Sequence, residues 1–105
     1  MQKLQAERLR SVKILLKMTE KEKALEILPN WFEGEVYEEG GVVTNPFSGE
    51  DYLLNAGELS MYDLIMGINY VGDHRGWDDE MIELHQKALS WFRTINPVAY
   101  MKLLD

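Results

Sequence analysis

Cysteine is absent from the 105-residue sequence, which excludes disulfides, thiolate zinc sites and cysteine nucleophiles together. Long apolar runs near the N-terminus are also absent. Residues 14–16 are bracketed by Lys13 and Lys17, so they form neither a signal-peptide core nor a membrane span. These absences favour a reducing compartment, and we expect a cytoplasmic protein without a membrane partner.

Recognisable catalytic motifs are missing as well. There is no P-loop, no Rossmann glycine pattern and no G-x-S-x-G turn. His85 falls on the apolar arc of a predicted helix, a position typical of a core histidine. Three acids surround His74 in the sequence: Asp73, Asp78 and Asp79. Their spacing fits neither zinc nor an EF-hand, so we expect no catalytic residue, metal or cofactor, and keep an unrecognised enzyme or metal-binding protein as an alternative.

The net charge of -7 is divided unevenly along the chain. Residues 1–23 hold seven Lys and Arg against three Glu, whereas the rest of the chain holds four against fifteen acids. An acidic body repels nucleic acid, so we expect no direct nucleic-acid partner. A second alternative is therefore an acidic inhibitor or nucleic-acid mimic that binds a basic groove of a host protein. Its acids would be Glu33, Glu35, Glu38, Glu39, Glu50 and Asp51.

Length and an apolar fraction of 46% predict a single domain, residues 1–105, with one core. Hydrophobic periodicity and capping signals predict a mainly α fold (α+β) of about four to five helices with one inserted β-hairpin. The expected helices span residues 4–18, 20–28, 56–71, 79–95 and 97–104. The hairpin is expected at residues 42–54, with a further edge strand around residues 35–38. Residues 72–79 are expected to form a polar loop.

The helix predicted over residues 56–71 is apolar in nearly every direction, which predicts burial on most sides. Its polar or small stripe is Ala56, Ser60, Asp63 and Gly67. We expect Asp63 to bond its backbone or to pair with Arg75 or Arg93, because buried carboxylates need partners. In the alternative, Ser60, Asp63 and Gly67 line a small pocket with Asp63 as its polar floor.

The helix predicted over residues 4–18 is amphipathic with a basic back. Its apolar arc is Leu4, Leu9, Val12, Leu15 and Leu16. The basic residues opposite are Lys3, Arg10, Lys13 and Lys17. This face is either solvated or docks on an acidic surface of another protein or of a second copy, and it is the best candidate for partner binding.

The loop predicted over residues 45–50 is a corner set by Asn45, Pro46 and Gly49. Phe47 is not required by the corner. Its ring either folds back onto the core, which we expect because burial stabilises an aromatic side chain by a few kcal/mol, or stands exposed as a partner contact.

Two runs resemble short acidic uncharacterised proteins of tailed phages and marine environmental sequences: "NPFSGEDYLLNAGELSMYDLIMG" at 45–67 and "KALSWFRTINPVAY" at 87–100. The resemblance implies expression inside a bacterial host and carries no activity. From the missing catalytic pattern and the split charge we expect a non-enzymatic binding or accessory protein. It would act through protein contacts with a partner or by self-association as a homodimer.

Overall fold

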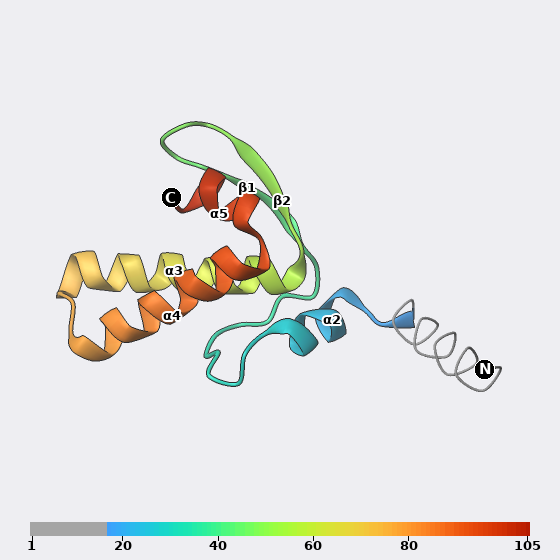
Figure 1. Cartoon of the computed structure of the whole chain (residues 1–105), viewed down its shortest axis with the longest axis horizontal. Helices are drawn as coiled ribbons and strands as arrows, with labels where there is room; N and C mark the ends of the chain where they lie inside the picture. Colours follow the sequence, from blue (N-terminus) through green and yellow to red (C-terminus); the bar gives the residue numbers. More distant parts are fainter. Residues whose placement is uncertain (1–16) are drawn as a thin grey trace.

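The computed structural model describes residues 17–105. Their order of elements is α2 (Glu20–Ile27), β1 (Gly41–Thr44), β2 (Asp51–Leu54), α3 (Ala56–Arg75), α4 (Asp79–Ile95) and α5 (Pro97–Leu103) (Figure 1). The prediction of a mainly α fold with one inserted β-hairpin is confirmed. The helix predicted over residues 4–18, with Lys3, Arg10 and Lys13, lies almost wholly outside the described residues.

Two capping boxes begin α2 and α3, as predicted. The Thr19 side chain accepts a hydrogen bond from the Glu22 backbone N–H at 3.1 Å. Asn55 does the same for the Glu58 N–H at 2.9 Å. In each box the glutamate side chain accepts in return from the backbone N–H of the capping residue, so two end groups of the helix are satisfied at once.

The last two helices also follow local signals. The Asp78 side chain accepts from the Met81 N–H at 2.8 Å and begins α4, whose bounds are those predicted. Asn96 ends α4 and caps α5, and Pro97 occupies the first turn of α5, where its missing N–H costs no hydrogen bond.

The hairpin pairs β1 with β2 in antiparallel register, Val43 opposite Tyr52 and Val42 opposite Leu53. Val43 and Tyr52 face the protein, whereas Val42 and Leu53 are exposed on the outer face. The strand expected around residues 35–38 is wrong: this segment is irregular, and within residues 17–105 the sheet has two strands.

The molecule is built around α3 and α4, which lie side by side and are joined by residues 76–78 (Figure 1). The hairpin and α5 lie on one side of this pair and α2 on the other. The core forms where the first half of α3, the second half of α4, α5 and β2 converge. Its buried residues are Leu54, Met61, Ile65, Ala88, Phe92, Ala99 and Leu103.

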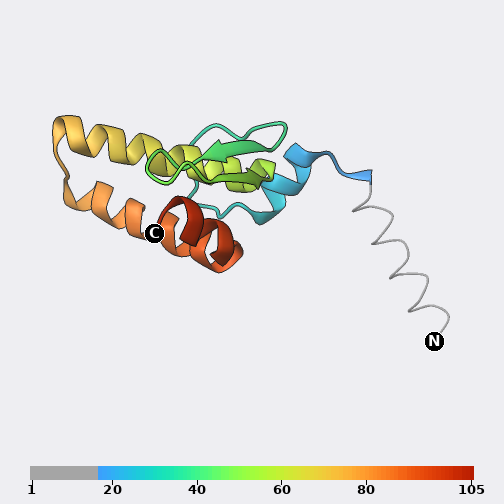
Figure 2. The same ribbon diagram turned by 90° about the horizontal axis from the view of Figure 1, so that it is seen from above.

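The end of the α3–α4 pair that carries the connecting residues 76–78 projects beyond the other elements in both views (Figures 1 and 2). The expected burial of α3 on most sides is therefore wrong for its second half, where Tyr70 and Val71 are exposed. Residues 72–75 are helical rather than loop, and α3 ends at Gly76, whose φ of 94° suits glycine. Among the described residues, no helix has both the length and the apolar character needed to cross a membrane.

Candidate functional site

Phe47 stands at the tip of the hairpin with 97% of its surface exposed. The expectation that its ring folds back onto the core is wrong. The loop backbone explains why: the Asn45 side chain accepts from the N–H groups of Phe47 (2.8 Å) and Ser48 (3.2 Å). Gly49 closes the turn with a φ of 76° and donates its N–H to the Asn45 carbonyl. These bonds fix the backbone of the corner with the ring directed away from the core.

Phe47 borders an open groove of about 610 Å³ between the hairpin loop and α5. Val98 and Met101 line the same groove and are 53% and 68% exposed. They are three residues apart on α5, opposite the buried Ala99 and Leu103, so they share one face. We call Phe47, Val98 and Met101 the hairpin-tip surface.

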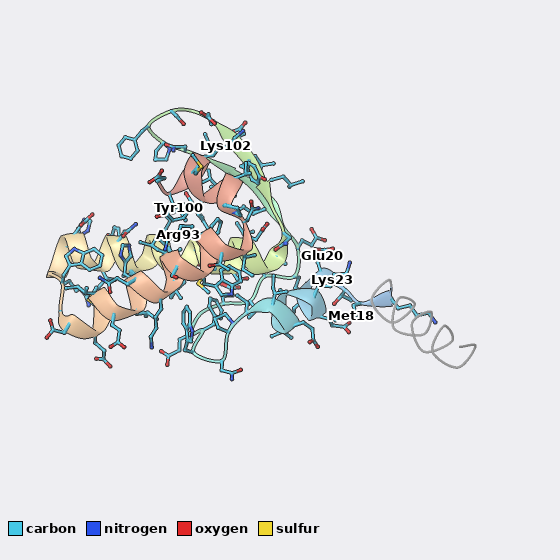
Figure 3. The ribbon with its side chains drawn as sticks, viewed as in Figure 1. Met18, Glu20, Lys23, Arg93, Tyr100 and Lys102 are labelled. Carbon is cyan, nitrogen blue, oxygen red and sulfur yellow. The ribbon has the colours of Figure 1, made fainter. Side chains whose placement is uncertain are left out.

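Lys102 connects α5 to the hairpin (Figure 3). Its ammonium group lies 3.9 Å from Glu50 and 5.8 Å from the centre of the Tyr52 ring. Its carbonyl accepts a hydrogen bond of 2.7 Å from the Asn45 side-chain amide. These contacts connect α5 to the hairpin and so hold the two parts of the hairpin-tip surface together.

A second groove lies on the α3–α4 pair, where two adjoining hollows of about 510 and 410 Å³ share Met81. We call it the Met81 groove. Its apolar side chains are buried, half-buried or partly exposed: Trp31, Leu64, Ile68, Val71, Met81 and Leu84. Its acidic side chains are exposed: Glu33, Glu35, Asp63, Asp78, Glu80 and Glu83. Lys87 also lines the groove, which thus has an apolar floor and a mainly acidic rim.

The three residues predicted to line one pocket, Ser60, Asp63 and Gly67, do not all lie at one site. Asp63 and Gly67 line the Met81 groove, but Ser60 does not. Ser60 is buried, donates its hydroxyl to the Ala56 carbonyl at 2.6 Å and accepts from the Tyr37 N–H at 3.0 Å. Ser60 is therefore a structural anchor for the segment before the hairpin.

Asp63 is exposed and, within residues 17–105, forms no ion pair with Arg75 or Arg93. The predicted arginine pairing is wrong, since Arg93 instead lies 5.9 Å from the centre of the Tyr100 ring (Figure 3). Asp63 neighbours the half-buried Tyr37. Burial and, next, the Asp63 carboxylate raise the pKa of the Tyr37 hydroxyl above its ordinary value of 10.0.

The acids considered for a nucleic-acid mimic do not form one row. Figure 1 places the segment containing Glu33 to Glu39 on the opposite side of the α3–α4 pair from the hairpin tip. At the tip, Glu50 lies near Lys102, and Asp51 accepts a hydrogen bond from Thr44. A mimic needs regularly spaced, exposed carboxylates, so this arrangement does not favour one.

The two histidines lie in different surroundings. His74 is exposed, stacks on Tyr70 and lies 2.8 Å from the Tyr70 carbonyl through Nδ1. His85 is half-buried against the edge of Trp77, and burial lowers its pKa below the ordinary 6.5. Among residues 17–105, no three His, Asp or Glu side chains converge in a way that could hold a metal ion.

Of the partner-binding residues predicted from the sequence, Lys17 and Phe47 lie in the described part of the chain and are exposed, and their role in binding stays a prediction. Sequence reasoning missed Val98, Met101 and the Met81 groove. The three-residue spacing of Val98 and Met101 was a usable signal, whereas the groove joins segments far apart in the sequence. Comparison of the chain with protein-family models, curated proteins and solved structures gives no match, so its geometry alone carries the functional inference.

Proposed function

We propose that the chain is a non-enzymatic binding or accessory module that acts through protein contacts, with the hairpin-tip surface as its contact. A homodimer is one form of that contact. The observation that carries the proposal is the Phe47 ring, 97% exposed on a loop whose backbone is fixed. The turn of the hairpin needs no aromatic residue, so we attribute the exposed ring to contact with a partner.

The rigidity of the loop matters energetically. A flexible side chain or loop loses conformational entropy when it binds, which offsets part of the contact energy. Asn45 restrains the loop through its bonds to Phe47, Ser48 and Lys102. The ring is therefore presented in one place, and binding orders little of the chain.

The chemistry of the surface also fits a protein partner. Phe47, Val98 and Met101 form an apolar centre, and Glu50 and Lys102 line the same groove as charged neighbours. Interfaces commonly combine an apolar centre, enriched in aromatic residues and Met, with a polar rim. The cysteine-free composition supports a reducing compartment such as the cytoplasm of a bacterial cell.

Phe47→Ala tests the proposal, with Leu25→Ala as the matched control because Leu25 is 57% exposed on α2, away from the hairpin-tip surface. Both variants should unfold in urea within about 0.5 kcal/mol of the wild type, since both side chains are mostly exposed. Each protein is then compared for self-association by sedimentation and for proteins retained from a bacterial lysate.

A contact kept by the wild type and by Leu25→Ala but lost by Phe47→Ala and by Met101→Ala supports the hairpin-tip surface. Identical self-association and identical retained proteins in all four would contradict it. A large loss of stability in Phe47→Ala would show that the ring serves the fold instead.

A further inference from the structure

Only some of the acidic residues that line the Met81 groove cap a helix or form an ion pair. Asp78 caps α4, and Glu80 lies in its first turn, where acids stabilise the helix. Glu83 lies 3.6 Å from Lys87. Glu33, Glu35 and Asp63 lie within ion-pair distance of no cation among residues 17–105, and Asp63 neighbours only the Tyr37 hydroxyl among the polar groups described above.

The combination of floor and rim defines what can fill the groove. Its floor favours apolar side chains, whereas its rim favours Lys and Arg on the same ligand. On α3 the groove extends from Asp63 to Val71, which at 1.5 Å per residue is about 12 Å, or roughly two helical turns. Two turns of a basic amphipathic helix have this chemistry and this size.

We propose that the Met81 groove binds the basic amphipathic segment, residues 3–17, of a second copy of the chain. In that segment Leu9, Val12 and Leu16 share an apolar arc, with Lys13 and Lys17 among the basic residues outside it. The whole chain shows the same separation of charge, since residues 1–23 are net basic and the rest is strongly acidic. Two copies therefore attract each other segment to groove, and a two-fold arrangement satisfies both grooves.

A second copy fits better than the same chain because of where the described chain begins. Met18 lies beside Asn55 and Gly57, at the start of α3. The segment containing Tyr37 packs on Ser60, between that point and Asp63. The described chain therefore begins at the start of α3 rather than at the groove, whereas the segment of a second copy approaches the groove from solvent.

Glu33→Gln/Glu35→Gln tests the groove without touching the Asp78 cap or the Glu83–Lys87 ion pair. Glu38→Gln/Glu39→Gln is the matched control, because it makes the same charge change on exposed residues outside the groove. The probe is a fluorescent synthetic peptide of residues 1–17, measured by anisotropy against the full chain. We expect affinity to fall about tenfold in the groove variant and to change less than about twofold in the control.

A scrambled peptide of the same composition separates shape from charge. The proposal predicts at least about tenfold weaker binding for it, because its apolar residues no longer share one face. Equal binding of both peptides, or equal affinity of the groove and control variants, would overturn the proposal.

Sedimentation of the full chain supplies the test of a second copy. We expect a dimer at about 0.01 M salt and dissociation at about 1 M, since the screening length falls from about 30 Å to about 3 Å. A monomer at both salt concentrations would overturn the proposal even if the peptide binds. The groove variant should lose this dimer and Phe47→Ala should keep it, so a dimer formed through the groove is distinguishable from one formed through the hairpin-tip surface.

Discussion

The side-chain amide of Asn45 donates a hydrogen bond of 2.7 Å to the main-chain carbonyl of Lys102, 57 residues further along the chain. The same side chain accepts two backbone hydrogen bonds within the hairpin loop. One residue therefore both shapes the loop and fastens it to α5. The position of Phe47 relative to Met101 depends on this connection.

Asn45→Ala should lower the free energy of unfolding by about 1–2 kcal/mol, because it removes three hydrogen bonds that shape the loop and join it to α5. Urea unfolding measures the loss. Ser48→Ala is the control, since it removes one exposed hydrogen bond to the Glu50 N–H and should change stability by less than about 0.5 kcal/mol. Equal effects of the two substitutions would show that Asn45 does not hold the loop to α5.

Gly72 and Gly67 on α3 should respond to alanine with opposite signs. A Cβ at Gly72 would overlap the Trp77 ring, whereas a Cβ at Gly67 would meet nothing within 4 Å. Gly67→Ala should stabilise the protein by up to about 1 kcal/mol, because alanine favours helix more than glycine does. Gly72→Ala should destabilise it and alter tryptophan fluorescence as the Trp77 ring is displaced. Thermal unfolding of both variants checks this, and stabilisation by Gly72→Ala would contradict the observed packing of Trp77.

Local chemistry made much of the fold predictable. Capping boxes and the Asn96–Pro97 stop depend on residues three or fewer positions apart, so α2, α3 and α5 begin where the sequence indicates. Features set by distant partners were missed. The segment at residues 35–38 has β-prone residues, but its Tyr37 N–H bonds to the side chain of Ser60 rather than to a strand.

In the candidate sites, too, the sequence indicates what depends on neighbouring residues and misses what depends on distant ones. The sequence indicates that Phe47 is surplus to the corner, yet its exposure depends on where α5 lies. The Met81 groove brings together the segment after α2, the middle of α3 and the start of α4. No local pattern contains that arrangement, so the acids of the groove could be counted from the sequence but not grouped.

Glu58 should be far more important to stability than Glu22, although both close a capping box. Glu58 is 7% exposed and also accepts a hydrogen bond of 2.8 Å from the Asn96 side chain, which joins the start of α3 to the α4–α5 junction. Glu58→Ala should cost about 2–3 kcal/mol, because it removes a buried side chain together with its bonds to two partly buried donors. Glu22→Ala, at an exposed site, should cost less than about 1 kcal/mol. Urea unfolding compares them, and equal costs would mean that the Asn96 bond adds nothing.

His85 should make the protein less stable as the pH falls. Burial lowers the pKa of His85 below 6.5, so the unfolded chain takes up a proton more readily than the folded one. The stabilisation is therefore present above about pH 6.5 and is lost as the pH falls through the folded-state pKa. His85→Gln should reduce the difference in melting temperature between about pH 7.5 and pH 5.5. An unchanged difference in His85→Gln would show that acid destabilisation arises from other groups.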